Sequence, residues 1–297
     1  MSIACLVVGK GYIGTYLQNY LTTLSSIETV QIVSRSKFNY VNQDLFLEKL
    51  TELKTSHDEV IVINCVGYTG KPNVDACEKD ENKADCWHLN AILPTKLALT
   101  AKQAACKFIH ISSGCIYDSY DKCYTEDDMP NFGLYSNKSS FYSKSKHAAE
   151  ESLKSIDYGT VLRIRMPFCS DLSNARNTLF KLTKYTRLIS HENSMTSVRD
   201  LTVFIGKLIT DNYLTGAFNI YNVVNEGIVT NKIIVTIFKR YSIDNKWLFV
   251  DDAELKMTAN RSNTVISTDK IKALGLHLPD VLGSIQACIR DQYTRLQ

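Results

Sequence analysis

The sequence predicts an α/β fold built on a doubly wound parallel sheet. Short runs rich in β-branched residues alternate with longer amphipathic stretches, which is typical of repeated βαβ units. A glycine-rich turn directly follows the first of these runs. The chain has 297 residues, of which 44% are hydrophobic and 22% charged, so it can bury one large core with a smaller region attached. This composition excludes disorder, collagen and coiled coil.

The expected elements follow one another in alternation. Strands are expected over Ile3–Val8, Thr29–Ser34, Glu59–Val66, Lys107–Ser112, Thr160–Ile164 and Ala217–Tyr221. Helices are expected over Tyr12–Leu24, Leu45–Thr55, Asn90–Ala105, Tyr142–Ser155 and Asn177–Tyr185. After about residue 166 the pattern loosens, so we expect a smaller, mainly helical region there.

Charge and cysteine content restrict the partners of the protein. The net charge is +3 and the basic residues form no block, so we expect a small-molecule partner, with no nucleic acid and no membrane. The first residues lack the basic segment of a signal peptide. Nine cysteines and six histidines without metal-ligand spacing predict free thiols, no metal site and a cytoplasmic location. No chemistry is assigned to the histidines.

The first motif opens a helix directly after the first strand and reads Gly9-Lys10-Gly11-Tyr12-Ile13-Gly14. Its first glycine suits a tight turn, its second a close approach of backbone to a pyrophosphate, and its third close packing of helix on strand. The N-terminus of the helix offers free N–H groups to phosphates. The motif therefore predicts dinucleotide binding, against the alternative of a merely tight turn.

The end of the second strand indicates which dinucleotide binds. An NAD enzyme usually has Asp or Glu there for the ribose 2′-OH, whereas this chain has Ser34-Arg35. A hydroxyl and a guanidinium suit a 2′-phosphate, and Lys10 adds charge, so NADP(H) is favoured; a solvated Arg35 is the alternative. We expect Asn64 and Gly67, at the end of the third strand, along the cofactor ribose.

These observations predict two regions. Residues 1–165 are expected to form an NADP-binding Rossmann domain. Residues 166–297 are expected to be mainly substrate-binding, with a strand over 217–221 returning to the sheet.

The second motif is the pair Tyr142 and Lys146, which lie one helical turn apart and therefore on one face. An adjacent ammonium and a nicotinamide cation favour the phenolate, so we expect Tyr142 to serve as an acid–base group near neutral pH. Ser113 follows an apolar strand about 30 residues upstream and can bond a substrate carbonyl beside Tyr142. With the glycine loop, these three residues resemble the extended short-chain dehydrogenase/reductase superfamily.

The residues after Ser113 narrow this resemblance. In the sugar-nucleotide 4,6-dehydratases of the superfamily an acidic pair follows the Ser or Thr, whereas this chain has Gly114-Cys115. Dehydratase chemistry is therefore not expected. Ser-x-Cys is similar to the GDP-fucose synthases, whose cysteine exchanges protons beside a 4-keto group. A Cys115 that only packs in the interior is the alternative.

Longer stretches resemble the nucleotide-rhamnose synthase/epimerase-reductase family over nearly the whole chain. They are Gly70–Glu78, Phe141–Lys146, Arg163–Pro167, Ser170–Asn174, Asn193–Thr196 and Arg261–Asn263. The resemblance implies that UDP-4-keto-6-deoxy-D-glucose becomes UDP-L-rhamnose by 3,5-epimerisation and NADPH reduction at C4. Two alternatives remain: a dTDP-4-dehydrorhamnose reductase that only reduces, and a non-catalytic NADP-binding regulatory subunit. A homodimer and an upstream 4,6-dehydratase are further expectations.

Inversion at two carbons needs proton-transfer groups on both faces of the sugar ring. Cys115 is expected to be one, because a thiol exchanges protons near neutrality when a cation stabilises the thiolate. Lys181, in the helix after residue 177, is expected to be the other; an exposed helix lysine is the alternative. Ser113 and Tyr142 are expected to stabilise the enolate oxygen at C4.

Three further residues are expected at the substrate side. Arg261, from the family resemblance, and Arg176, from its position, are candidates for the sugar diphosphate because a guanidinium pairs bidentately with phosphate oxygens. Asn90 is expected to support the site in the family manner, with a helix cap as the alternative.

Overall fold

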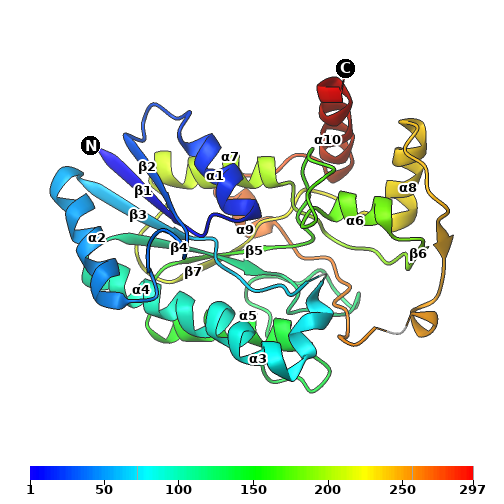
Figure 1. Ribbon diagram of the computed structural model, residues 1–297, viewed down its shortest axis with the longest axis horizontal. Helices are drawn as coiled ribbons and strands as arrows, with labels where there is room; N and C mark the ends of the chain where they lie inside the picture. The colour runs from blue at the N-terminus through cyan, green and yellow to red at the C-terminus, as the bar shows by residue number, and fades with distance from the viewer. Residues whose placement is uncertain (72, 256, 297) are drawn as a thin grey trace.

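The computed structural model describes residues 1–71, 73–255 and 257–296; Pro72, within the motif at 70–78, lies outside them. Six parallel strands form one sheet in the order β2-β1-β3-β4-β5-β7 (Figure 1). Their bounds are β1 Ile3–Val8, β2 Thr29–Val33, β3 Glu59–Asn64, β4 Lys107–Ser113, β5 Thr160–Ile164 and β7 Asn219–Asn222. The strand order reverses between β1 and β3, which confirms the predicted doubly wound α/β class.

The central strands are buried on both faces. Every residue of β1, β3 and β5 is buried; β1 is an unbroken apolar run, and the other two strands are mainly apolar. β3 ends at Asn64, two residues before the expected end, because the Asn64 side chain turns back and accepts a hydrogen bond from the Val66 N–H at 3.0 Å. This turn starts the loop that faces the glycine motif.

Helices cover the two faces of the sheet in separate groups. One face packs against α2 (Gln43–Ser56), α4 (Leu93–Gln103) and α5 (Phe141–Ser155), with Leu50, Leu97 and Leu153 in a common core. The other packs against α1 (Tyr12–Leu21) and α7 (Val198–Thr210). Figure 1 shows α4 and α5 on one side of the sheet and α1 and α7 on the other.

The remaining helices form a second region at the carboxyl ends of the strands (Figure 1). Its elements are α6 Thr178–Lys184, β6 Arg187–Leu188, α8 Asn231–Arg240, β8 Leu248–Phe249, the short 3₁₀ turn Asp252–Glu254 and α10 Val281–Leu296. These elements have a core of their own, which includes Phe168, Leu182 and Phe238. Within the described part of the chain, no helix is long and apolar enough to cross a bilayer.

The segment after residue 165 serves both regions. β7 pairs with β5 at the edge of the main sheet, and α9 (Asp269–Ala273) contributes Ile271 to the core beneath it. Leu201, Phe204 and Leu208 of α7 fill the same core as α1. The chain therefore returns to the sheet after passing through the second region, and a boundary at residue 165 stays a prediction.

Two helix boundaries differ from expectation by three or more residues. The first helix ends at Leu21 rather than Leu24, because the Thr22 and Thr23 hydroxyls donate to carbonyls of the preceding turn. The helix expected from Asn90 begins earlier: α3 (Asp80–Trp87) continues through a π turn, His88–Ile92, into α4. Asn90 is therefore inside a helical run and is not a cap.

The two glycines that open α1 are predicted to tolerate alanine differently. A Cβ on Gly14 meets the Gly9 carbonyl oxygen at 2.1 Å, whereas a Cβ on Gly11 meets no atom within 4 Å. Gly14→Ala should lower the free energy of unfolding of the cofactor-free protein by about 1–3 kcal/mol. Gly11→Ala should change it by less than about 0.5 kcal/mol. Urea unfolding measures both; equal losses in the two variants contradict this packing.

Candidate active site

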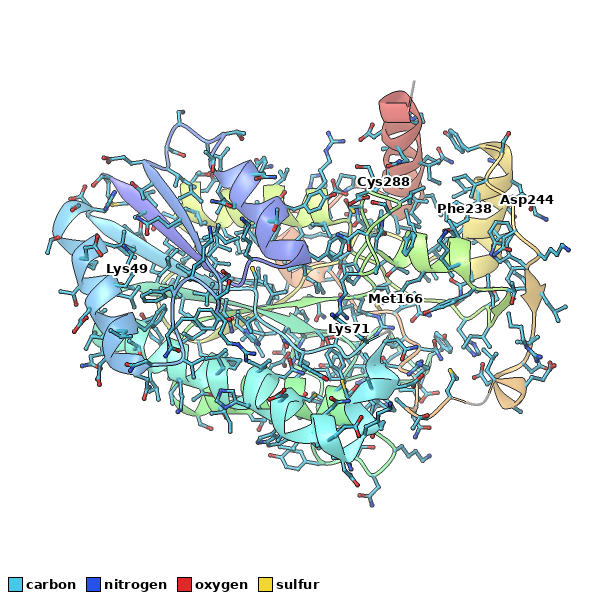
Figure 2. All side chains as sticks on the ribbon, in the orientation of Figure 1. Lys49, Lys71, Met166, Phe238, Asp244 and Cys288 are labelled. Carbon is cyan, nitrogen blue, oxygen red and sulfur yellow. The ribbon has the colours of Figure 1, made fainter. Side chains whose placement is uncertain are left out.

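The carboxyl ends of β1, β3, β4 and β5 open into a cavity of about 760 Å³. Ligands in open α/β sheets bind at this edge, where the strand order reverses. The second region closes the cavity from the other side, with Met166 at the junction near the middle of the molecule (Figure 2). The lining includes eight predicted site residues: Gly11, Tyr12, Ile13, Gly67, Ser113, Cys115, Tyr142 and Lys146, and three more from the far wall, Arg176, Lys181 and Arg261.

The glycine loop fits a dinucleotide pyrophosphate. Gly9 has a φ of +105°, which favours glycine, and its N–H donates to the Val33 carbonyl at 2.9 Å. Gly11 leaves open space where a side chain would stand, and the N-terminus of α1 follows at Tyr12. Backbone N–H groups thus face a space with room for a diphosphate.

The predicted 2′-phosphate residues lie beside this loop and outside the cavity lining. Lys10 follows β1 and Arg35 follows β2, and both side chains are exposed. The Gly9–Val33 hydrogen bond brings the two strand ends together. Ser34 Oγ lies 3.1 Å from Ser36 Oγ. Two cations and two hydroxyls thus lie beside the glycine loop.

The expected trio of Ser113, Tyr142 and Lys146 is brought together. Ser113 ends β4, and its Oγ accepts from the Cys115 N–H at 3.1 Å. Tyr142 lies in the first turn of α5, which Ser140 caps by accepting from the Ser143 N–H at 3.1 Å. Ser113 and Tyr142 are hydrogen-bonded to each other. A carbonyl oxygen placed in this cavity can meet both hydroxyls.

The protonation states suit a proton donor. Burial raises the pKa of Tyr142 well above its ordinary value, and the Ser113 hydrogen bond opposes this only in part. Without the nicotinamide cation, desolvation therefore favours the phenol form of Tyr142, and the expected lowering of its pKa toward neutrality stays a prediction for the protein with cofactor bound. Burial also lowers the pKa of Lys146 to about 8. Tyr142 thus stays protonated while Lys146 can exchange a proton near neutral pH.

Lys146 has a buried environment that the sequence did not indicate. Its Nζ donates to the Ile111 carbonyl at 2.9 Å and lies 3.5 Å from His110 Nε2. His110 is fully buried in β4, and its Nδ1 lies 3.1 Å from Asn64 Nδ2. A histidine alternating with apolar residues in a strand was the only available signal.

Cys115 lines the cavity two residues beyond Ser113. Arg165, at the end of β5, places Nη1 3.8 Å from the Cys115 sulfur and donates to the Gly114 carbonyl at 3.0 Å. Its guanidinium also forms hydrogen bonds with Ser262 and Asn193, and Arg165 is only 1% exposed, so its position is fixed. Arg165 is thus the cation beside the Cys115 sulfur, a contact that sequence analysis missed.

Three neighbouring cations, Lys181, Arg176 and Arg261, line the far wall of the cavity. Burial, together with Arg176 and Arg261, lowers the pKa of Lys181. Arg261 is paired with Asp75 through two hydrogen-bonding nitrogens, each 2.9 Å from a carboxylate oxygen. Arg176 donates to the Thr69 hydroxyl and the Gly70 carbonyl. Both arginines thus bridge from the second region to the loop after β3.

Two predicted residues support the site from outside the cavity lining. Asn90 is fully buried; its Oδ1 accepts from the Tyr68 N–H at 2.7 Å, and its Nδ2 donates to the Tyr68 carbonyl and to Ser145 Oγ. These bonds occupy the amide, so the expectation that Asn90 contacts substrate is corrected: it holds the loop after β3 against α5. Asn64 is likewise fully buried.

The residues that the structure describes contain no group of three or more His, Cys, Asp or Glu side chains arranged to hold a metal ion. All nine cysteines are free thiols.

Comparison with known proteins identifies the family of this chain. The RmlD substrate binding domain family matches residues 3–294. The bifunctional dTDP-4-dehydrorhamnose 3,5-epimerase/dTDP-4-dehydrorhamnose reductase of Arabidopsis thaliana is 31% identical over 81% of this chain and 77% of its own length. RHM1 of the same plant, named as a trifunctional UDP-glucose 4,6-dehydratase/UDP-4-keto-6-deoxy-D-glucose 3,5-epimerase/UDP-4-keto-L-rhamnose-reductase, is 32% identical over 83% of this chain.

The chain spans 36% of the length of that trifunctional relative. Among solved structures, the L780 UDP-rhamnose synthase of Acanthamoeba polyphaga mimivirus superposes with a TM-score of 0.82, at 26% identity, over 96% of this chain and 98% of its own. A dTDP-4-dehydrorhamnose reductase from Bacillus anthracis in complex with NADP shares the fold, with a TM-score of 0.77 at 20% identity, over 98% and 99% of the two chains. The suspected resemblance is confirmed, and the chain belongs to the RmlD substrate binding domain family.

Proposed function

We propose that the protein converts UDP-4-keto-6-deoxy-D-glucose to UDP-L-rhamnose by 3,5-epimerisation and NADPH-dependent reduction at C4. The observation that carries this proposal is the shared cavity. Ser113 and Tyr142 lie on one wall with Cys115, and Lys181 lines the same space from the second region. The direct test is oxidation of NADPH on addition of the UDP-4-keto-6-deoxy sugar, with L-rhamnose identified in the product.

In the reduction, the protein binds the cofactor and provides the proton. Gly9, Gly11 and the start of α1 would hold the pyrophosphate, and Lys10 and Arg35 would bind the 2′-phosphate. When bound, NADPH would supply a hydride to C4. Tyr142, protonated at neutral pH because burial raises its pKa, gives its proton to O4. The proton from Lys146 then restores Tyr142.

In the epimerisation, two groups act on opposite faces of the sugar ring. One removes the proton at C5 or C3, which leaves an enolate with its charge on O4, and the other returns a proton to the opposite face. Cys115 and Lys181 are assigned these roles, because both line the cavity and the Lys181 pKa is lowered by burial and nearby arginines. The Ser113 and Tyr142 hydroxyls stabilise the enolate oxygen.

The relatives support both reactions, since the plant bifunctional enzyme is named as a 3,5-epimerase and a reductase, and the mimivirus protein as a UDP-rhamnose synthase. The bacterial structural neighbours favour a second candidate, reduction of dTDP-4-dehydrorhamnose alone. The two candidates differ in whether Cys115 exchanges protons with the substrate. In either case a 4,6-dehydratase has to supply the 4-keto sugar.

We expect NADPH to bind more tightly than NADH, because the second strand ends with Arg35 and no carboxylate for a free 2′-OH. Arg35→Asp should reverse or abolish the preference, since it replaces a cation that attracts the 2′-phosphate by a carboxylate that repels it. Fluorescence titration of both cofactors measures the ratio. A ratio that stays unchanged in the variant shows that Arg35 does not contact the phosphate.

Tyr142→Phe should lower the turnover of reduction by about 10²–10⁴, the usual contribution of a general acid. Cofactor binding should remain, because Tyr142 lies in α5 and the glycine loop follows β1. Stopped-flow NADPH oxidation and cofactor titration separate the two effects. More than about a tenth of wild-type turnover with normal binding means that another group donates the proton.

Cys115→Ala should remove epimerisation and keep reduction. Exchange of solvent deuterium into C3 and C5, followed by NMR without NADPH, should fall by at least about 10². Reduction of a 4-keto-rhamnose nucleotide that is already epimerised should survive, because Ser113 and Tyr142 are untouched. Exchange at the wild-type rate would falsify a role for the thiol and leave the protein a reductase only.

Lys181→Met should block net inversion by the same assay, while some exchange remains if Cys115 still removes a proton from its own face. Lys184, three residues on and exposed, is the matched control. Lys184→Met should behave as wild type. If both lysine variants invert the substrate normally, the second proton-transfer group lies elsewhere in the cavity.

A further inference from the structure

A chain of hydrogen bonds runs beneath the cavity from the end of β3 to Lys146. The Val66 N–H donates to Asn64 Oδ1 at 3.0 Å, and Asn64 Nδ2 lies 3.1 Å from His110 Nδ1. His110 Nε2 lies 3.5 Å from Lys146 Nζ. Asn64 and His110 are fully buried and Lys146 is 3% exposed, so water does not substitute for these contacts.

The donor-to-acceptor direction of this hydrogen-bond chain is determined at the Val66 end. A backbone N–H can only donate, so the Asn64 atom facing Val66 must be the amide oxygen. The other branch of the amide is then the NH₂ group, which donates to His110 Nδ1. A neutral imidazole that accepts at Nδ1 carries its hydrogen on Nε2. His110 therefore presents an N–H to Lys146.

This N–H discriminates between the two forms of Lys146. An ammonium has no lone pair, so it meets the His110 N–H as one donor facing another. The 3.5 Å separation is longer than the usual hydrogen bond of about 2.9 Å, as two facing donors require. A neutral amine can accept from His110 while it still donates to the Ile111 carbonyl, 2.9 Å away.

The other groups around Lys146 act in known directions. Burial lowers its pKa, while Glu150, one turn along α5, and the buried thiols of Cys86 and Cys65 oppose that shift. Burial, followed by the nearby Lys146, lowers the pKa of His110 well below its ordinary value. His110 thus remains neutral across the pH range in which Lys146 titrates, and acts there as a fixed donor.

We propose that His110 is a positioning residue for reduction: held in the Nε2–H tautomer by Asn64, it opposes the charged form of Lys146 and sets the pH at which Lys146 releases its proton. This inference rests on the proposed reduction. When Tyr142 has given its proton to O4 and Lys146 has replaced it, the neutral amine that remains accepts the His110 N–H. The spent state of the relay is thereby stabilised, and no net charge is left buried beside His110.

The tautomer is read directly on the wild-type protein by long-range ¹H–¹⁵N correlation of ¹⁵N-histidine-labelled samples. His110→Gln assigns the resonance by its loss. We expect the neutral Nε2–H form from about pH 5 to pH 9, a range that spans the ordinary histidine pKa. An Nδ1–H tautomer or an imidazolium at neutral pH overturns the inference.

The pH profile of reduction tests the effect on Lys146. Tyr142 stays protonated, so kcat/KM should fall as pH rises through the Lys146 pKa of about 8. His110→Phe keeps a ring but lacks the N–H, and loss of this opposing donor stabilises the ammonium. The basic limb of the profile, where kcat/KM falls, should therefore move up by at least about half a pH unit. His110→Gln keeps a donor, and its limb should stay near that of wild type.

His147 provides the matched control. It is also a buried histidine with a lowered pKa, it follows Lys146 in α5, and its Nδ1 accepts from the Leu134 N–H at 2.9 Å. His147→Gln should leave the limb in place. A limb that does not move upward in His110→Phe, or that moves equally in His147→Gln, contradicts the inference. The protein could show the Nε2–H tautomer and yet reduce no 4-keto sugar. That result would refute the proposed function, while the hydrogen-bond chain itself would stand.

Discussion

A buried ion pair holds the reactive helix against the sheet. Arg163 of β5 donates to Glu150 of α5 through Nη2 at 2.7 Å and Nε at 3.0 Å, and Ser112 of β4 donates to the other carboxylate oxygen at 2.5 Å. Both charged side chains are at most 3% exposed. Removing one partner of such a pair typically costs about 3–5 kcal/mol, because a buried charge is left alone. Tyr142 and Lys146 precede Glu150 on the same helix, so this pair fixes their distance from β4.

A second buried guanidinium joins the two regions. Arg165 reaches from the end of β5 to Asn193 and Ser262, and on the way contacts the backbone and sulfur beside Ser113. The sulfur of the proposed proton-exchange group therefore contacts a side chain that joins the two regions, whereas the proposed proton donor lies on a helix that Glu150 ties to the sheet.

The sequence predicts features that depend on local pattern. Strands buried on both faces appear as mainly apolar runs. The glycine spacing of residues 9–14 reflects the fact that any side chain on Gly14 would collide with the Gly9 carbonyl oxygen. Asn90 was misread because a polar residue in a helix looks the same whether it caps, binds a ligand or bonds a distant loop. His110 and Arg165 were missed because their roles depend on residues about 35 to 100 positions away. Such pairings arise from the topology of the sheet and leave no periodic signal.

The pairing of Arg261 with Asp75 affects more than the position of one arginine. With Lys181 protonated, the group formed by Lys181, Arg176, Arg261 and Asp75 carries two positive charges in excess. The diphosphate of a nucleotide sugar carries two negative charges. Binding it beside these four groups would bring their summed charge to zero.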